Sequence, residues 1–140
     1  MLVGYMRVSS DSDRQSTDLQ RDALLAGTRV CVFPSEKEGW GLTVIEANAL
    51  GTPVVARNAP GLRDSVRHDK TGILVSVDAG KPMTEETEAY AKAIGDLLDE
   101  TEAAVALRRR CLDWAAHFDW NRATEQMEEA IEATLAETTP

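Results

Sequence analysis

Apolar residues change their spacing along the chain, and the change predicts alternating strands and helices. Short runs rich in β-branched residues occur at Leu2–Val8, Arg29–Phe33, Val54–Ala56 and Ile73–Val75. Such runs are typical of strands that are buried on both faces. Because helical segments separate them, we expect right-handed crossovers and a parallel sheet of about four strands.

The segments between these runs have apolar residues three and four positions apart, as in amphipathic helices. We predict helices over Arg14–Ala26, Leu42–Leu50 and Leu62–Arg67. The C-terminal third is expected to be helical throughout, with Thr84 and Asp119 as N-caps. The stripe of the last helix comprises Ala123, Met127, Ile131 and Leu135.

These elements predict an α/β fold, namely a Rossmann-like three-layer half-domain with a helical C-terminal third. A length of 140 residues suits one domain spanning residues 1–140. No stretch approaches the ~20 consecutive apolar residues of a membrane span, so we expect a cytoplasmic chain. A short sheet leaves an open edge or apolar face, and we therefore expect a homodimer.

The negative charge is concentrated in the C-terminal third. Residues 1–84 contain 10 acidic and 10 basic residues, whereas residues 85–140 contain 14 acidic and 5 basic ones. An acidic segment repels phosphate backbones, so no nucleic-acid partner is expected. Cys31, Cys111, His68 and His117 lack metal-ligand spacing, which predicts reduced thiols and neither metal nor cofactor.

The segment Pro34–Ala47, with the sequence PSEKEGWGLTVIEA, contains the candidate chemistry. It follows a parallel strand, where open α/β sheets bind their ligands. Gly39 and Gly41 allow a ligand to approach the backbone, and a helix beginning near Leu42 offers N–H groups to an anion. This arrangement suits sugar hydroxyls and diphosphates.

Five motifs follow one another after about Thr28. They are Pro34-Ser35, Glu38-Gly39-Trp40-Gly41, Glu46-Ala47, Gly51-Thr52-Pro53-Val54-Val55-Ala56 and Thr71-Gly72-Ile73-Leu74-Val75. In order and spacing they resemble the retaining GT-B glycosyltransferases of group 1. The resemblance implies a nucleotide-sugar donor site formed by Glu38 near the sugar, Gly39, Trp40, Gly41 and Leu42 at its hydroxyls and phosphate, Thr43 near the diphosphate, and Glu46 at the ribose.

The chain also departs from that family. A complete member resembles two facing Rossmann-like domains, with the acceptor site in the first and a diphosphate-binding Arg/Lys pair early in the second. Neither feature has a counterpart here, so we expect a truncated donor-binding domain without turnover on its own. Arg57, Arg63 and Arg67 are nearby in sequence, but we interpret them as a solvated loop face.

Each of these residues also has a purely structural interpretation. Glu38 can be a loop carboxylate, and Glu46 a helix carboxylate favoured by the macrodipole. Trp40 either stacks on a sugar or packs against the protein. Trp114 and Trp120 are expected in the core or at helix junctions.

The first 27 residues resemble a different family. The segments GYMRVSS at 4–10 and DLQRDAL at 18–24 are similar to the N-terminus of serine recombinases of the resolvase and invertase type. In that resemblance Ser9 matches the nucleophile and Arg7 an active-site arginine. The later arginines and the DNA-binding domain have no counterpart, so no recombinase activity is expected. The chain is interpreted as a chimera joined near Gly27, with residues 28–140 as the glycosyltransferase part.

Three functions remain open. The first is weak nucleotide-sugar binding without turnover. The second is an active glycosyltransferase formed in trans with a separate N-terminal domain. The third is a chimeric folding or interaction module without a ligand, including a recombinase-derived fragment without recombinase activity. Loss of ligand affinity in Glu38→Ala and Glu46→Ala would separate the first two from the third.

Overall fold

The computed structural model describes residues 27–76, 80, 82–99 and 101–138. Three parallel strands form its sheet, in the order β1 (Cys31–Phe33), β2 (Val54–Arg57) and β3 (Gly72–Val75). Strand β2 is central and pairs with both neighbours. The predicted α/β class with a short parallel sheet is confirmed. The strand expected at Leu2–Val8 and the helix expected at Arg14–Ala26 lie outside the described residues.

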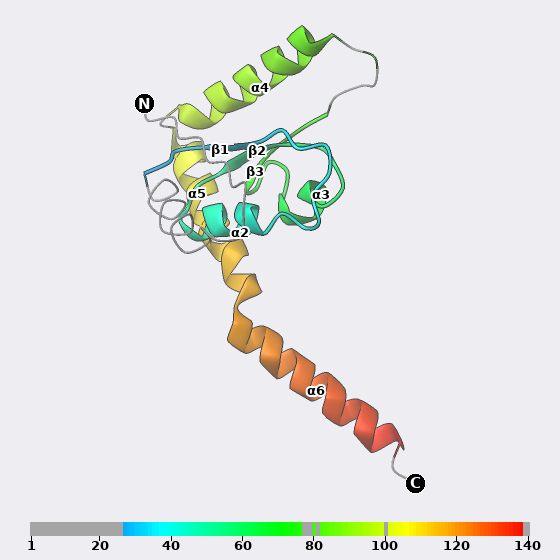
Figure 1. Cartoon of the computed structure of the whole chain (residues 1–140). Helices are drawn as coiled ribbons and strands as arrows, with labels where there is room; N and C mark the ends of the chain where they lie inside the picture. Colours follow the sequence, from blue (N-terminus) through cyan, green and yellow to red (C-terminus); the bar gives the residue numbers. More distant parts are fainter. Residues whose placement is uncertain (1–26, 77–79, 81, 100, 139–140) are drawn as a thin grey trace, which may run out of the picture.

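Helices follow each strand and then occupy the remainder of the described chain. They are α2 (Leu42–Ala49), α3 (Leu62–Ser65), α4 (Met83–Leu98), α5 (Glu102–Ala115), the 3₁₀ turn η2 (Ala116–Phe118) and α6 (Trp120–Thr138). In Figure 1, α4 lies on one side of the sheet, and α2 and α3 lie on the other. The chain therefore forms three layers, as the Rossmann-like pattern predicts.

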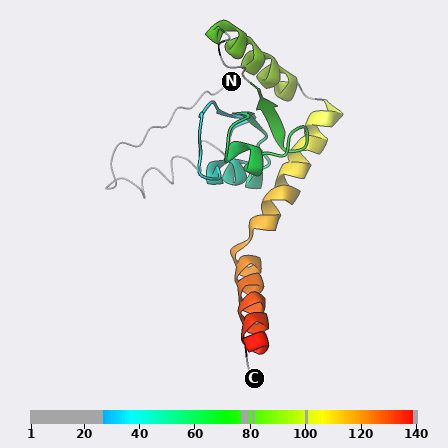
Figure 2. The same cartoon turned by 90° about the vertical axis from the view of Figure 1, so that its right-hand side faces the viewer.

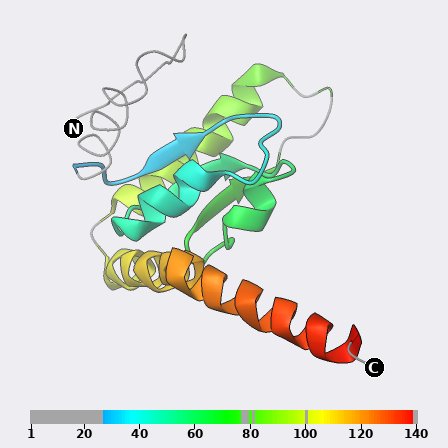
Figure 3. The ribbon, with the colours of Figure 1, turned by 60° about the horizontal axis from the view of Figure 1, so that its bottom comes forward.

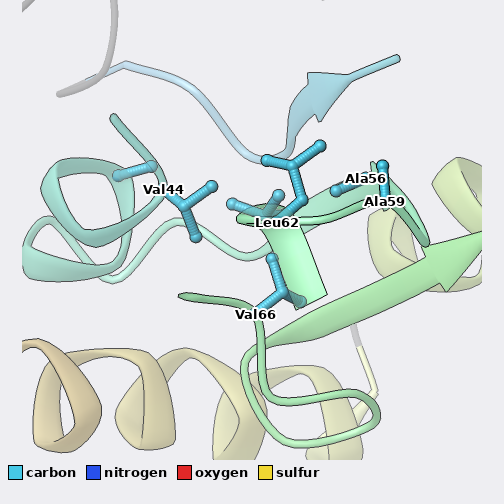
Figure 4. Close-up of a cluster of buried hydrophobic side chains, with 7 residues drawn as sticks. Val44, Ala56, Ala59, Leu62 and Val66 are labelled. Atoms are coloured by element: carbon cyan, nitrogen blue, oxygen red, sulfur yellow. The ribbon is translucent and has the colours of Figure 1, made fainter. Parts of the chain in front are cut away.

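The side chains of β2 alternate between two cores. Val54 and Ala56 join α2 and α3 in a cluster of fully or nearly buried side chains, which Figure 4 shows around Leu62. Val55 points to the opposite face and packs with side chains of α4 and α5, including Tyr90 and Cys111. A strand covered on both faces needs apolar residues at every position, which explains the unbroken run of small and β-branched residues in β2.

Capping residues define two of the three long helices. The Thr101 hydroxyl accepts a hydrogen bond from the Ala104 N–H at the start of α5. The Asp119 carboxylate accepts bonds from the N–H groups of Asn121 and Arg122, so its predicted role as an N-cap is confirmed. The cap predicted at Thr84 is wrong. Helix α4 begins at Met83, after Pro82, because proline tolerates the extended backbone that precedes a helix.

Helix α6 projects from the body as an arm. Figures 1, 2 and 3 show it leaving the end of α5 and extending away from the sheet. Every α6 residue whose side chain is described is exposed, and Trp120 at its start is 85% exposed. Trp120 therefore lies at the junction between η2 and α6, one of the two positions expected for it, and not in the core. No helix among the described residues is long and apolar enough to cross a membrane.

Candidate functional site

The candidate site is a pocket at the carboxyl end of β1. It has a volume of about 350 Å³ and is lined by Phe33, Glu38, Gly39, Trp40, Gly41, Leu42, Thr43 and Leu62. Six of the seven residues expected to bind a donor are in this lining, and they come from one loop and the first turn of α2. Parallel α/β sheets bind ligands at this end because the strand-to-helix loops converge there.

The loop that forms the pocket packs against the turn that contains Gly61. This glycine has a φ of 83°, and a Cβ on it would lie 2.9 Å from the carbonyl oxygen of Gly39. The Glu38 N–H also donates a hydrogen bond to the carbonyl of Pro60, at 3.3 Å. The loop therefore rests directly on the turn before α3, and only glycine leaves room for that contact.

Gly41 ends the loop in a conformation that starts α2. Its φ of 75° is in the left-handed region, and its carbonyl accepts the N–H of Val44 at 2.9 Å. A Cβ at this position would lie 2.8 Å from the Ser65 hydroxyl oxygen. The backbone of Gly41 is thus in tight contact with α3. The positive end of the α2 dipole borders the pocket, which favours an anionic ligand group there.

Trp40 packs against the protein as part of an aromatic cluster. Its ring meets Phe118 edge to face, with 4.7 Å between centroids. Phe118 in turn meets Trp114 at 4.8 Å, and the Arg67 guanidinium lies 4.1 Å from the centroid of the Trp114 ring. Trp114 is therefore at a helix junction, as expected, and its indole N–H donates to the Ser65 carbonyl. The cluster joins the pocket loop to η2, at the base of α6.

The two candidate carboxylates differ in position. Glu38 is half-buried and lines the pocket. Glu46 is also half-buried, but it lies one turn into α2, beyond Thr43, and is not among the pocket-lining residues. The structure thus brings Glu38 and residues 39–43 together, with Glu46 further along the same helix.

Arg57 is the cation at the carboxyl end of β2, and two carboxylates neutralise it. Its guanidinium donates to Glu36, at 3.0 Å, and to Glu86. The Arg57 and Glu86 side chains are 21% and 20% exposed, whereas Glu36 is 84% exposed. The hydrogen bond that Arg57 donates to Glu86 raises the pKa of Arg57, against the opposing effect of desolvation. The interpretation of Arg57 as a solvated loop residue is wrong; Arg63 and Arg67 are exposed.

Two residues that line the pocket were not predicted from the sequence as site residues. Phe33 is the last residue of β1, and Leu62 is the first residue of α3. Phe33 could have been found from its place directly before the Pro34 break. Leu62 could not, because its contact with the loop depends on the packing of α3.

The remaining predicted residues do not contribute to the described site. Arg7 and Ser9 lie outside the described residues. Within the described part of the chain, no group of three or more His, Cys, Asp and Glu side chains is arranged to hold a metal ion.

The sequence matches one known family over most of its length. The family described as Glycosyl transferases group 1 matches residues 14–112. The chain belongs to this family. The match begins at residue 14, so it includes about half of residues 1–27, the segment that was assigned to a recombinase. The join expected near Gly27 is therefore not supported, and neither is the recombinase resemblance.

Curated relatives of the group 1 chain share the name D-inositol 3-phosphate glycosyltransferase. The protein from Corynebacterium urealyticum is 34% identical over 71% of this chain and 22% of its own length. Those from Salinispora tropica and Rhodococcus opacus are 33% and 35% identical over 82% and 83% of this chain. The chain spans only 22% and 24% of the lengths of these two relatives.

A solved structure shares the fold. The pneumococcal O-GlcNAc transferase GtfA, crystallised in complex with UDP and GlcNAc, is similar with a TM-score of 0.71 and 23% identity. The match covers 89% of this chain and 26% of that one. The group 1 chain is thus homologous to part of a GT-B glycosyltransferase, within the donor-binding domain.

Proposed function

We propose that this group 1 chain binds a nucleotide-sugar donor in the pocket at the carboxyl end of β1, and that it does not transfer the sugar on its own. The sugar would face Glu38 and the Gly39–Gly41 backbone. The diphosphate would lie at the start of α2, beside Thr43, and the ribose would lie toward Glu46.

One observation supports this proposal above the others. The pocket combines glycine backbone, one half-buried carboxylate and the N-terminal end of an eight-residue helix. Hydroxyl groups of a sugar can be bound by a carboxylate and by backbone amides. A diphosphate is stabilised by the helix N-terminus because the unpaired N–H groups and the macrodipole both favour negative charge.

The same site explains why turnover is not expected. A departing nucleoside diphosphate must be stabilised by positioned cations. Arg57, at the carboxyl end of β2, is paired with Glu36 and Glu86. Among the described residues that line the pocket there is no lysine or arginine. We therefore propose weak binding, which a separate acceptor domain could complement in trans.

The test is a thermal-shift titration with uridine, guanosine and adenosine diphosphates and their sugars. A ligand present at 100 times its Kd should add ~2.7 kcal/mol of stability. In a domain of this size that corresponds to a rise in Tm of several degrees. Absence of a shift with every nucleotide at millimolar concentration would refute donor binding.

Variants distinguish the proposed pocket from nonspecific binding. Glu38→Ala and Glu46→Ala should reduce the shift while leaving the Tm without ligand nearly unchanged. Glu88→Ala is a matched control, because Glu88 is an exposed carboxylate on α4 outside the pocket. Equal loss of the shift in all three variants would indicate a general charge effect and contradict the proposed site.

A further inference from the structure

Helix α6 presents an apolar stripe that nothing in the described chain covers. Met127, Ile131 and Leu135 follow one another at intervals of four residues and are 62%, 52% and 61% exposed. Ile131 and Leu135 also line a shallow hollow with Ala130 and Thr134. Single exposed apolar residues are common, but a continuous row along a helix marks a contact surface.

One edge of this stripe is acidic. Glu128 lies three residues before Ile131, and Glu132 lies three residues before Leu135. Residues three apart on a helix are neighbours, so both carboxylates border the stripe on the same side. A surface that covers the stripe should therefore present apolar side chains beside a cation.

The outer face of α5 has that composition. Val105 and Leu112 are 66% and 47% exposed and lie two turns apart on one face. Arg109 is exposed and lies between them, four residues after the first and three before the second. Leu50, at the end of α2, is 50% exposed and is followed by Gly51, where an added Cβ would lie 3.7 Å from Leu112, so this end of α2 lies beside the patch.

Helix α5 carries most of the positive charge of the acidic C-terminal third. Residues 85–140 contain only 5 basic residues, and three of them are the consecutive Arg108, Arg109 and Arg110 of α5. Arg108 and Arg110 donate to the backbone carbonyls of Arg29 and Lys70. Arg108 and Arg109 both lie three or four residues from Val105 and Leu112, and Arg109 is the exposed one of the two.

We propose that α6 of one molecule packs on the outer face of α5 in a second copy of this chain, and that the second copy returns the same contact. The apolar stripe covers Val105, Leu112 and Leu50, and Glu128 and Glu132 face Arg109. This inference does not depend on nucleotide binding.

A second copy fits better than the molecule itself or an α6–α6 pair. In Figures 1 and 2, α6 points away from its own body, so its stripe cannot reach its own α5 face. An antiparallel α6–α6 pair would bring the acidic edges together, which is unfavourable, and a parallel pair would place the acidic edge beside Ala130 and Thr134 rather than beside a cation. Two-fold symmetry doubles the α6–α5 contact, which helps it approach the ~1,200 Å² of a stable interface.

The test measures the dimer dissociation constant of the full chain by sedimentation equilibrium. The unaltered chain should dimerise at micromolar concentration, and Ile131→Asp should abolish dimerisation. The pair Glu128→Lys with Glu132→Lys should weaken the dimer about tenfold, and Arg109→Glu should weaken it by a similar factor. Glu129→Lys, two residues from both Met127 and Ile131, is the matched control and should leave the constant unchanged.

Mixing the two charge-reversed chains provides the decisive comparison. In a mixed dimer, the lysines introduced on α6 of one chain face the glutamate introduced at position 109 of the other. In the second contact, Glu128 and Glu132 face Arg109 as in the unaltered chain. The mixture should therefore recover the affinity of the unaltered chain. A monomeric unaltered chain would overturn the proposal. An Arg109→Glu chain that dimerises normally would also overturn it, since that result indicates α6–α6 pairing. Circular dichroism of each variant verifies that the fold is retained.

Discussion

The α/β body and the α6 arm are both built from amphipathic segments, yet they differ in what their apolar residues contact. In the body, β2 is covered on both faces, and the Val54, Val55 and Ala56 side chains are fully buried. In the arm, the apolar stripe is exposed along its length. A hydrophobic period predicts that a helix has a face to bury, but it does not identify the surface that covers it.

This difference also separates two sources of stability. Burial of apolar area stabilises the body. The arm depends on its helix propensity, its N-cap and any partner that covers its stripe. The body and the arm should therefore respond differently to equivalent substitutions.

The largest difference is expected for leucine truncation. Leu62, the first residue of α3, is fully buried in the cluster that Figure 4 shows, so Leu62→Ala should lower the free energy of unfolding by ~2–5 kcal/mol. Leu135→Ala in the arm removes the same atoms from an exposed site and should change it by less than ~0.5 kcal/mol. Urea denaturation at a protein concentration too low for dimerisation measures both. Equal losses would contradict the distinction between body and arm.

A smaller loss is expected at the turn that supports the pocket loop. Gly61→Ala places a Cβ against the Glu38 and Gly39 backbone at a positive φ, and should cost ~1–3 kcal/mol. It should also abolish any nucleotide-induced thermal shift, because the loop must move. Gly95→Ala is the control. Gly95 is in the interior of α4 with open space around it, so alanine there should raise stability by up to ~1 kcal/mol.

The arm has its own weak point at its first turn. Asp119→Ala removes the carboxylate that accepts the N–H groups of Asn121 and Arg122, at a cost of ~1 kcal/mol to α6. We expect the helical circular dichroism signal to decrease while the unfolding transition of the body remains in place. A matching decrease in the body's transition would show that the two regions unfold together.

The last effect is zero at neutral pH and appears only as the pH rises above 9, in the body alone. Burial raises the pKa of Cys31 to about 11 and that of Cys111 to about 12, from an ordinary 9.0. The folded state thus favours the protonated thiols. Their contribution to stability is complete below pH 9 and is lost as the pH rises toward 11 and 12. Chemical denaturation should show a steeper fall above pH 9 in the unaltered chain than in a Cys31→Ala, Cys111→Ala variant.

Local sequence signals predicted several elements because local chemistry determines them. Helix α2 starts at Leu42, as expected, and ends at Ala49, one residue before the predicted end. Its limits follow from two glycines with positive φ, Gly41 and Gly51, which flank it. Asp119 is an N-cap for the same kind of reason, since a cap depends only on residues within one turn.

The features that sequence reasoning missed depend on contacts between distant segments. Trp40 had two interpretations because a glycine-flanked indole can stack on a ligand or on the protein. Its contact with Phe118 joins residues far apart in the chain. Arg57 was assigned to solvent because isolated arginines are usually exposed. Its partner Glu86 is on α4, and only the fold brings that helix to the end of β2.

The edge-to-face contact between Trp40 and Phe118 connects the pocket loop to movements of α6. Phe118 belongs to η2, the short joint between α5 and α6, and Trp40 belongs to the pocket wall. A helix of 19 residues is about 28 Å long, so a small rotation of α6 about that joint produces a large sweep at its tip. Conversely, a force applied at the tip acts on the joint with a long moment arm, and the contact of Phe118 with Trp40 connects that joint to the loop around the pocket.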